Sequence, residues 1–523
     1  MLQIYVDSAT TRVAGLSEKL TEELRFALSY SIPGYVFTRA YAHGWDGRKS
    51  FLHKGGRFLT GLLPRACQYL DSIEEPYRIV EDLRPEYPEE EFCPAFPLRS
   101  FQPDVLEQVQ RYRRGIVSAP PRSGKTILAV ELFRRTSLSP FLYIVWQAEV
   151  AHQAANKFRK LLPGAKVGVI ADGKADLDGD ILVVTFQSLA SAFGLKVKRK
   201  DCPKGMKKER ILPLLRHAPV QRICRDSKVV VWDEAHHTSS DIAQLLAQEF
   251  HKAAYVVGLT ATPWREDASD IGIEAVTGPI LYHMSYEEAV ERGIILPLDV
   301  TVFQLPAEDL DTRGGYQQVY KTALVDNDRY HRTVAHIVEY LRRRGKTVAV
   351  IVGHVPHGQQ LERAIPRSLF VSGKSSPGER RAGLRHIEEQ DGVCLISTLI
   401  DEAVDLPTLD AIVVADVKKS AIKAFQRLRS MTVSEGKKRA TAVFFQPDVV
   451  HLKNHAERTV KFLRSEQPPF RVFRRRIYGS GQIGPAERLR PTKRSRRTRR
   501  LTVLPGATAE ERKAVQETAN PAG

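Results

Sequence analysis

The octapeptide Ala119-Pro-Pro-Arg-Ser-Gly-Lys-Thr126 constrains this chain more than any other stretch. The apolar run Gly115-Ile-Val-Ser118 before it predicts a buried strand, and Ile127-Leu-Ala-Val-Glu-Leu-Phe133 after it predicts a helix. A loop in this context binds nucleotide phosphates, because the backbone N–H groups at the start of the helix point at the anion. Ala119 stands where the full pattern has glycine, so the alternative for the loop alone is a basic turn between a strand and a helix.

The residues of this loop have distinct expected roles. Lys125 would reach the β- and γ-phosphates, and the Thr126 hydroxyl would bind Mg²⁺. The other loop residues would surround the nucleotide: Ala119, Pro120, Pro121, Arg122, Ser123 and Gly124.

A second buried strand ends in an acidic pair, in the run Val229-Val-Val-Trp-Asp-Glu-Ala-His-His237. Ligands of open α/β sheets bind at the carboxyl edge of the strands. We expect Asp233 to hold Mg²⁺ through water and Glu234 to orient the water that attacks the γ-phosphate. His236 would relay between the nucleotide and a polymer site. With the phosphate loop, the pair predicts a site for ATP and Mg²⁺.

Strand and helix patterns alternate around these motifs. Further apolar runs at 141–145 and 181–184 predict buried strands, and 149–162 predicts a helix between them. Such alternation is typical of an α/β fold with a mostly parallel sheet covered by helices. A length of 523 residues is too great for one core and predicts about three domains. Residues 81–97 are acidic, contain four prolines and have the composition of a linker.

The net charge of +18 favours a polyanionic partner, most simply nucleic acid. The charge is uneven, because residues 471–500 hold 12 lysines and arginines against one acid. The alternative is a solvated, disordered tail. Sequence patterns predict no membrane span and no signal peptide, and five scattered cysteines indicate neither a disulfide framework nor a zinc site. We therefore expect a cytoplasmic protein; its protein partners are not indicated.

Residues 1–90 predict a small α+β domain. A strand at 2–6 precedes a helix that Ser17 would cap, and a hairpin around Trp45-Asp-Gly-Arg48 precedes a strand and a helix over 62–70. Aromatic and basic residues alternate here, as in surfaces that bind a nucleic-acid backbone: Tyr35, Phe37, Arg39, Tyr41, Trp45, Arg48, Lys49, Lys54 and Arg57. The alternative is that the aromatics form a core and the charges a solvated face.

Across residues 98–465 the chain resembles the superfamily 2 helicases and translocases. Gly258-Leu-Thr-Ala-Thr-Pro-Trp-Arg-Glu-Asp267 resembles their motif III, in which Thr260 and Thr262 would link hydrolysis to movement. Leu98-Arg-Ser-Phe-Gln102 resembles the element that reads adenine through Gln102. Val184-Thr-Phe-Gln-Ser-Leu189 resembles a strand-contacting motif that would place Thr185 near a phosphate. The Asp-Glu-Ala-His-His form is similar to the DEAH-type branch of XPB, restriction translocases and UvsW.

The resemblance continues into a second α/β stretch. Cys394-Leu-Ile-Ser-Thr-Leu-Ile-Asp-Glu-Ala-Val-Asp-Leu-Pro407 resembles motif V, which implies that Thr398 contacts nucleic acid and Asp405 contacts nucleotide or couples the domains. Motif VI departs from the family pattern, because Gln426 is kept while Arg429 stands at the glycine and Ser430 and Val433 replace the two arginines. Either Arg427 or Arg429 substitutes at the γ-phosphate, or the ATPase is slow or switched off.

Residues 1–90 resemble the N-terminal domain of UvsW-type helicases of phages, which implies nucleic-acid contacts by Trp45 and Arg48. The family then implies two tandem RecA-like domains with parallel sheets, at 91–297 and 298–466, followed by a basic, largely disordered tail at 467–523. By analogy, the function is ATP-dependent remodelling of branched DNA or R-loops, with annealing as a further activity. Two alternatives are a DNA-binding or annealing protein with an impaired ATPase and the translocase subunit of a restriction system.

One basic stretch lies outside these motifs. Residues 194–210 hold eight lysines and arginines against two acids. We interpret them as a loop that grips a duplex or its phosphates; the alternative is a solvated insertion.

Overall fold

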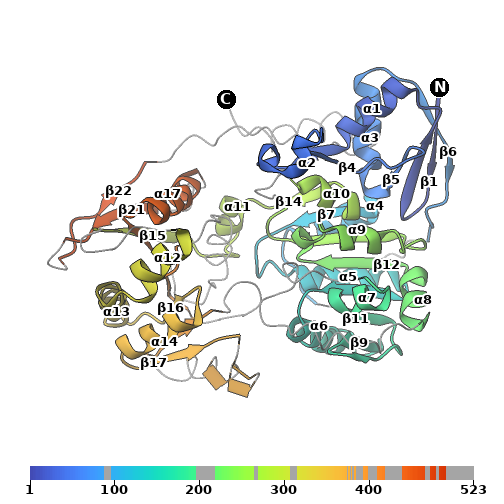
Figure 1. The fold of residues 1–523 in the computed structure, drawn as a ribbon. Helices are drawn as coiled ribbons and strands as arrows, with labels where there is room; N and C mark the ends of the chain where they lie inside the picture. The colour runs from blue at the N-terminus through green and yellow to red at the C-terminus, as the bar shows by residue number, and fades with distance from the viewer. Residues whose placement is uncertain are drawn as a thin grey trace. The chain divides into compact units, whose positions relative to one another are not determined.

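The structure is a computed structural model, and its description covers most of the chain. The described residues are 1–87, 96–195, 218–263, 269–306, 315–373, 375–376, 378–379, 382–383, 393–398, 409–417, 439–465, 471–478 and 482–490. They form two compact units (Figure 1). The first unit consists of Met1–Ala119 and Gly124–Met284, and the second of Ser285–Arg496, with which the turn Pro120–Ser123 is grouped. Among the described residues, no helix combines the length and the apolar character that crossing a membrane requires.

The first unit begins with a four-stranded sheet in the order β5-β2-β1-β6. Its strands are β1 (Leu2–Val6), β2 (Thr10–Ala14), β5 (Arg57–Leu59) and β6 (Tyr77–Asp82), and its helices are α1 (Glu18–Ala27) and α3 (Leu63–Ser72). The predicted cap of α1 is confirmed, because the Ser17 hydroxyl accepts a hydrogen bond from the Leu20 N–H at 3.2 Å.

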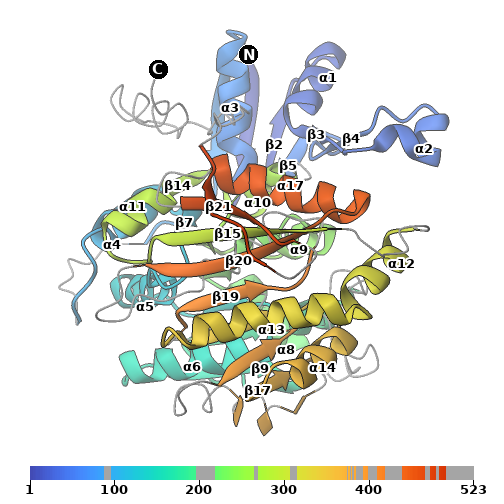
Figure 2. The ribbon, with the colours of Figure 1, turned by 90° about the vertical axis from the view of Figure 1, so that its left-hand side faces the viewer.

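A long excursion leaves this sheet between α1 and β5. Strands β3 (Ser29–Ser31) and β4 (Arg48–Ser50) pair with each other, and between them lie the short helices η1 (Tyr35–Phe37) and α2 (Arg39–Ala42). Figure 2 shows α2 beyond the β3–β4 pair, away from the two larger sheets of the first unit. The two stretches that follow the Trp45–Arg48 turn therefore join different sheets, since β4 pairs with β3 and β5 pairs with β2. Phe51 and Leu52 turn into the core and end β4.

The larger sheet of the first unit has the order β10-β9-β11-β8-β12-β13-β7-β14 and is parallel apart from β10. Its strands are β7 (Arg114–Ser118), β8 (Phe141–Val145), β9 (Val167–Ala171), β10 (Lys174–Ala175), β11 (Ile181–Thr185), β12 (Val229–Asp233), β13 (Tyr255–Thr260) and β14 (Ile280–His283). Its helices are α4 (Gln102–Tyr112), α5 (Lys125–Thr136), α6 (Ala148–Leu161), α7 (Phe186–Ala192), α8 (Ala218–Asp226), α9 (Asp241–Ala247) and α10 (Asp270–Thr277). Parallel strands bring the residues after β7, β12 and β13 to one edge.

The small sheet and the large sheet share one hydrophobic core. Buried residues of β1, α1 and α3 belong to the same apolar cluster as those of β12 and α10. The chain passes close against α10 at Gly61, where a Cβ atom would lie 2.2 Å from the Glu274 carbonyl oxygen. Polar contacts span the same boundary, because Arg65 Nε donates to Glu274 Oε2 at 3.0 Å and Arg114 donates to the carbonyls of Ser8 and Val276. The small sheet is therefore built onto α10.

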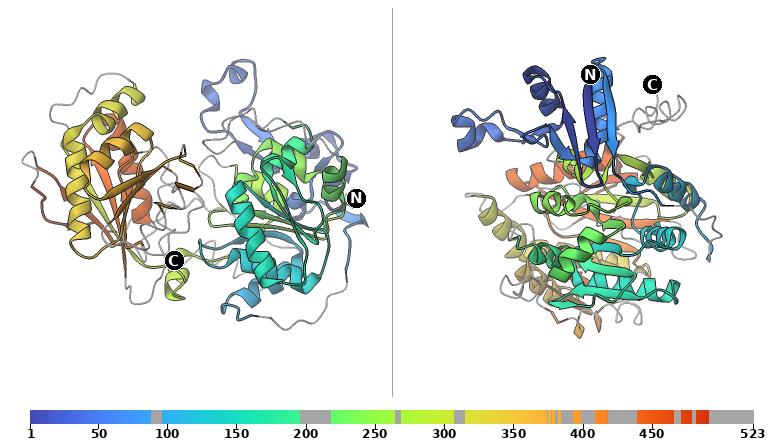
Figure 3. Two further views of the ribbon diagram at one scale, coloured as in Figure 1. Left: turned by 90° about the horizontal axis from the view of Figure 1, so that it is seen from below. Right: turned by 90° about the vertical axis from the view of Figure 1, so that its right-hand side faces the viewer.

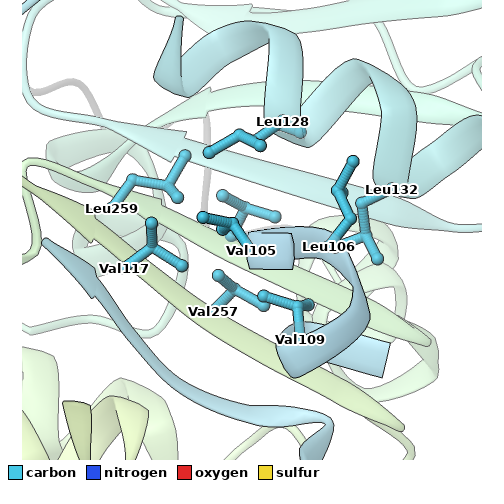
Figure 4. A pocket seen from close by; sticks show the side chains of 10 residues that line it. Val105, Leu106, Val109, Val117, Leu128, Leu132, Val257 and Leu259 are labelled. Carbon is cyan, nitrogen blue, oxygen red and sulfur yellow. The ribbon is translucent and has the colours of Figure 1, made fainter. Parts of the chain in front are cut away.

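The phosphate-loop helix α5 packs over a small apolar cavity (Figure 4). Its volume is about 10 Å³, close to the least that one water molecule needs. Side chains from α4, α5 and the strands β7, β12 and β13 line it: Val105, Leu106, Val109, Val117, Leu128, Ala129, Leu132, Val231, Val257 and Leu259. The cavity offers no polar group to a ligand, and we interpret it as imperfect packing beneath α5.

The second unit contains another eight-stranded sheet, in the order β17-β18-β16-β19-β20-β15-β21-β22, parallel apart from β22. Its strands are β15 (Leu298–Leu305), β16 (Val348–Ile351), β17 (Ser368–Val371), β18 (Cys394–Ser397), β19 (Ala411–Val414), β20 (Ala440–Pro447), β21 (Arg471–Arg476) and β22 (Glu487–Arg488). Its helices are α11 (Tyr286–Glu291), α12 (Tyr316–Tyr320), the π-helix η7 (Lys321–Val325), α13 (Asp328–Arg342), α14 (Val355–Ala364) and α17 (Val450–Ser465). The predicted fold class, two α/β domains with mostly parallel sheets, is confirmed.

The structure corrects the prediction for the beginning of the tail. The sequence predicted a domain boundary at 466 and little order beyond it, whereas β21 pairs with β15 along its whole length. Val472 is buried, and Arg471 Nη2 contacts Asp299 Oδ2 at 2.6 Å. The run of arginines concealed the strand, because only one residue of β21 enters the core. Residues 491–523 lie outside the described residues.

The contact between Arg65 and Glu274 gives a test of how firmly the small sheet is attached. Replacing Arg65 with alanine leaves the buried Glu274 carboxylate without this cation, and we expect the free energy of unfolding of the first unit to fall by about 1–3 kcal/mol. Urea denaturation of the full chain measures it. Arg25→Ala is the matched control, since its exposed pair with Glu22 is worth about 0–1 kcal/mol. Equal losses in the two variants would contradict the prediction.

Candidate nucleotide site in the first unit

The predicted phosphate loop leaves the carboxyl end of β7 and enters α5. Gly124 has a φ of 91°, a conformation that favours glycine, and a Cβ atom there would lie 2.5 Å from Gln102 Nε2. Lys125 Nζ donates to the Ala119 carbonyl oxygen at 3.3 Å and lies 4.0 Å from Glu234 Oε1. The loop therefore presents the N-terminus of a 12-residue helix and one ammonium group, which together form an anion site.

The acidic pair lies at the end of the neighbouring strand β12. Asp233 Oδ2 accepts a hydrogen bond from the Tyr143 hydroxyl at 2.9 Å, and the Asp233 carbonyl accepts one from Trp146 Nε1 at 2.9 Å. Burial, and then the charge of Glu234, raises the pKa of Asp233 to about 6. Burial also acts to raise the pKa of Glu234, but Lys125 and His236 outweigh it and lower that pKa to about 2. The pair thus carries excess negative potential that a cation would relieve.

The Tyr143 hydroxyl connects the two residues expected to hold Mg²⁺. It contacts Thr126 as well as Asp233, and burial followed by the Asp233 charge raises its pKa well above the ordinary tyrosine value. The hydroxyl therefore stays protonated and donates to Asp233. Thr126, Asp233 and nearby Glu234 supply the oxygen ligands that Mg²⁺ prefers, so the residues present fit this metal.

Glu234 has a backbone conformation that non-glycine residues adopt rarely. Its φ is 47° and its ψ is 52°, in the left-handed region. The turn aims the carboxylate between the Lys125 ammonium and the His236 imidazole, because Glu234 Oε1 faces Lys125 and Oε2 lies 3.3 Å from His236 Nδ1. Such strained residues concentrate at functional sites.

Thr260, at the end of β13, connects three of the predicted motifs. Its carbonyl accepts a hydrogen bond from the Ala119 N–H at 2.9 Å, which ties it to the phosphate loop. Its hydroxyl lies 3.2 Å from His236 Nδ1 and accepts from the Thr262 N–H at 3.2 Å. The structure therefore brings the phosphate loop, the Asp-Glu pair and the motif III threonines into one hydrogen-bonded set.

Two aromatic residues and a glutamine at this edge were missed by the sequence reasoning. Tyr143 and Trp146 both support Asp233, and Gln187 Nε2 donates to the Trp146 carbonyl at 3.1 Å. The Trp146 ring also packs against His237, with ring centroids 4.8 Å apart. One signal was available, because a tyrosine inside an otherwise apolar strand needs a partner for its hydroxyl.

Gln102 and Thr185 occupy buried positions in the first unit. Gln102 is 2% exposed, and its side chain accepts from the Arg99 N–H at 2.9 Å and donates to the Gly124 carbonyl at 3.4 Å. The structure thus places it against the phosphate loop, and its contact with adenine stays a prediction. The Thr185 hydroxyl caps α7 and lies 2.7 Å from the Ser188 hydroxyl. Its contact with a nucleic-acid phosphate likewise stays a prediction.

Two of the remaining predicted residues, Trp45 and Arg48, belong to the excursion that ends in β4 and not to this hydrogen-bonded set. Trp45 Nε1 donates to the Arg48 carbonyl at 3.1 Å, and the Arg48 guanidinium stacks 3.8 Å over the Phe26 ring and donates to Ser29 Oγ at 2.8 Å. Thr398 directly follows β18 in the second unit and is half-buried. Four predicted nucleotide-site residues lie outside the described residues: Asp405, Gln426, Arg427 and Arg429. Most of the basic loop over 194–210 lies outside them as well.

The Tyr143 hydroxyl gives a test of the proposed metal position. Tyr143→Phe removes the group that orients Asp233 and Thr126, and we expect the affinity for Mg²⁺ in nucleotide binding to fall by about 10–100-fold. Titrating Mg²⁺ against a fluorescent ATP analogue bound to the full chain measures this. Tyr5→Phe is the control, because it removes a hydroxyl that donates to the exposed Gln3 on the small sheet. An unchanged Mg²⁺ dependence in Tyr143→Phe would contradict the assignment.

Comparisons with known proteins agree with this geometry. Residues 95–265 match the family described as type III restriction enzyme, res subunit. A putative helicase 22 of Sulfolobus islandicus filamentous virus is 25% identical over 372 residues, which cover 66% of this chain and 63% of that protein. The DNA 3'-5' translocase XPB2 of Sulfurisphaera tokodaii is 28% identical over 200 residues, 38% of each chain. The chain thus spans less than two thirds of the length of either relative.

A solved structure shares the fold. The fragment of a putative HsdR subunit of a type I restriction enzyme from Vibrio vulnificus has a TM-score of 0.53 and 16% identity, covering 84% of this chain and 79% of that one. This likeness concerns the fold alone. The family match over the nucleotide site and the helicase relatives, one of which extends well beyond it, support a superfamily 2 helicase.

Proposed function

We propose that this protein is an ATP-dependent nucleic-acid motor, a helicase or translocase that acts on DNA. The observation that carries the proposal is the hydrogen-bonded set around Thr260, which joins the phosphate loop to His236 and to Thr262. A nucleotide-binding protein needs only the loop, whereas a motor needs a physical connection between the nucleotide and the parts that grip its track.

In this proposal the phosphates of ATP bind the N–H groups at the start of α5 and the ammonium of Lys125. Thr126 and Asp233 hold Mg²⁺, which supplies charge neutralisation at the phosphates. Tyr143 donates to Asp233 and keeps that carboxylate oriented. The pKa of Glu234, lowered to about 2, keeps its carboxylate ionised so that it accepts a hydrogen bond from the attacking water.

Lys125 and Glu234 provide a simple on-switch for hydrolysis. The Lys125 ammonium faces the Glu234 carboxylate at 4.0 Å, so the two charges partly engage each other. A bound γ-phosphate competes for Lys125, because its charge is greater than that of one carboxylate. Glu234 then turns its charge toward water. His236, 3.3 Å from Glu234, carries the change to the Thr260 hydroxyl.

Nucleic acid is the proposed track, for two reasons. The net charge of +18 favours a polyanion, and the relatives include a protein named as a DNA 3'-5' translocase. We propose branched DNA or R-loops as the substrates, on the resemblance of residues 1–90 to the N-terminal domain of UvsW-type helicases. The proposed contacts to the nucleic-acid strand are Trp45, Arg48, Thr185 and Thr398. The residues proposed to complete the nucleotide site are Asp405, Gln426, Arg427 and Arg429. The proposed location is the cytoplasm of a prokaryote or of an infected cell.

Two other functions remain in competition. A translocase subunit of a restriction system has the same fold, as the likeness to an HsdR subunit illustrates, and a partner would supply the cleavage. A DNA-binding or annealing protein with an impaired ATPase follows from the unusual motif VI, in which Ser430 and Val433 replace two arginines. Loss of an arginine at the γ-phosphate costs about 10³–10⁵ in rate, so measured turnover separates this alternative from a motor.

Nucleic-acid-stimulated hydrolysis of ATP is the decisive test. We expect the wild type to hydrolyse ATP faster when DNA is added and Lys125→Ala to lose both basal and stimulated turnover, because the phosphates lose their cation. Phosphate release is measured with single-stranded, duplex, forked and RNA–DNA substrates.

Lys166→Ala is the matched control for this test, since its ammonium lies on the exposed surface beside Asp178, and it is expected to behave as the wild type. Equal background turnover in the wild type and Lys125→Ala would eliminate the motor and leave the annealing protein.

The basic C-terminal stretch has its own test. Residues 491–523 contain eight lysines and arginines against three acids. Deleting them removes cations that displace counterions, so we expect a shallower dependence of log affinity on log salt concentration. The truncation begins after 490 so that β21 and β22 stay in the sheet. Fluorescence anisotropy with duplex DNA at several salt concentrations gives the slope, and an identical slope in both proteins would show that the stretch does not contact DNA.

A further inference from the structure

The excursion between β3 and β4 is a built structure that projects from the first unit (Figure 3). The Tyr35 ring packs on Gly47, where a Cβ atom would lie 2.1 Å from the ring and where φ is 76°. Tyr35 also meets the Tyr41 ring edge-on, with centroids 5.3 Å apart. The backbone N–H of Trp45 donates a hydrogen bond to the Ala40 carbonyl oxygen at 3.0 Å. These contacts hold the excursion in one shape.

The same contacts decide which aromatic rings face outward. Tyr35 and Trp45 are half-buried because they form the inner side of the excursion. Phe37, at the end of η1, is 92% exposed, and the neighbouring Val36 and Tyr41 are 46% and 47% exposed. The Phe37 ring gains no free energy of burial within the chain, although the segment that carries it has a defined structure. Such an exposed apolar side chain indicates a binding surface.

The charge around Phe37 selects the kind of partner. Residues 26–58 contain five lysines and arginines and one acid, Asp46. Asp46 Oδ1 accepts a hydrogen bond from the Arg48 N–H at 2.9 Å, so this acid is engaged within the turn. Arg39, in the first turn of α2, is exposed two residues from Phe37. Cations beside an outward ring match a phosphate backbone with an accessible base.

We propose that Phe37 stacks on an unpaired base of the bound nucleic acid, with Tyr41 beside it and Arg39 at the adjoining phosphate. The inference rests on the proposed nucleic-acid motor and assigns a base contact to Phe37, one of the aromatic residues that the sequence grouped with Trp45 as candidates for nucleic-acid contact. The stacked base would lie on the unit that holds the phosphate loop, to which β4 is joined by the pair of Lys49 with Asp241 at the start of α9.

Abasic DNA separates stacking from phosphate contacts. The probes are a fluorescein-labelled single-stranded oligonucleotide and its abasic counterpart of equal length and charge, each titrated with the full-length chain. We expect the wild type to bind the oligonucleotide with bases about 10-fold more tightly, and Phe37→Ala to lose most of that preference. Phe37→Trp should retain it, and Phe37→Leu, which keeps apolar area without a ring, should resemble the alanine variant.

Tyr340→Ala is the matched control, because it removes a partly exposed aromatic ring of α13 in the second unit. It is expected to keep the preference. Since the Phe37 side chain is 92% exposed, its substitution should leave thermal unfolding unchanged.

The outcomes distinguish this inference from the proposed function. If DNA stimulates the ATPase but Phe37→Ala or Phe37→Leu keeps the full preference for bases, the stacking contact is wrong and the motor stands. If the wild type shows neither stimulation nor binding, both are wrong. Loss of binding to phosphatidylserine vesicles in Phe37→Ala, or loss of self-association in sedimentation, with the base preference unchanged, would assign the surface to a membrane or to a second copy.

Discussion

The buried Thr260 is the residue on which the arrangement of the site depends. Its carbonyl extends the pairing of β13 with β7 as far as Ala119, and its hydroxyl reaches His236 and Thr262. One residue thus contacts the start of the phosphate loop, the turn after the Asp-Glu pair and the chain beyond β13. Because it is wholly buried, these hydrogen bonds do not compete with water, and a displacement at one contact is felt at the others.

The N-terminal sheet is attached to helices that follow the motifs joined by Thr260. The helix α10 follows Thr262 in the chain, and it is the surface on which Gly61 and Arg65 pack. The start of α9, which follows the Asp-Glu turn, holds Lys49. The small sheet therefore packs on the helix that follows Thr262, and the excursion that carries Phe37 contacts the helix that follows the Asp-Glu turn.

Local patterns in the sequence predicted the parts that depend on near neighbours. Ser17 caps α1 as expected, because a cap involves residues three positions apart. The phosphate loop and the Asp-Glu pair were recognised because each lies directly after an apolar strand. By contrast, the pairing of β4 with β3 and the entry of β21 into the second sheet were missed, since β-pairing joins residues distant in the chain and the arginines of β21 resemble those of a solvated tail.

By itself the sequence determined the fold class, the order of the motifs and the residue types that can bind phosphate and Mg²⁺, because these follow from periodicity and from chemistry at short spacing. Only the tertiary structure decided that Tyr143 holds Asp233, that Thr260 joins three motifs, and that Phe37 rather than Trp45 faces outward. The reason is that a side chain's role depends on the tertiary contacts that it makes and on whether these contacts leave it exposed. The loop Ala119–Thr126 indicates a nucleotide-binding site, and the packing around it determines which residues are connected to the bound nucleotide.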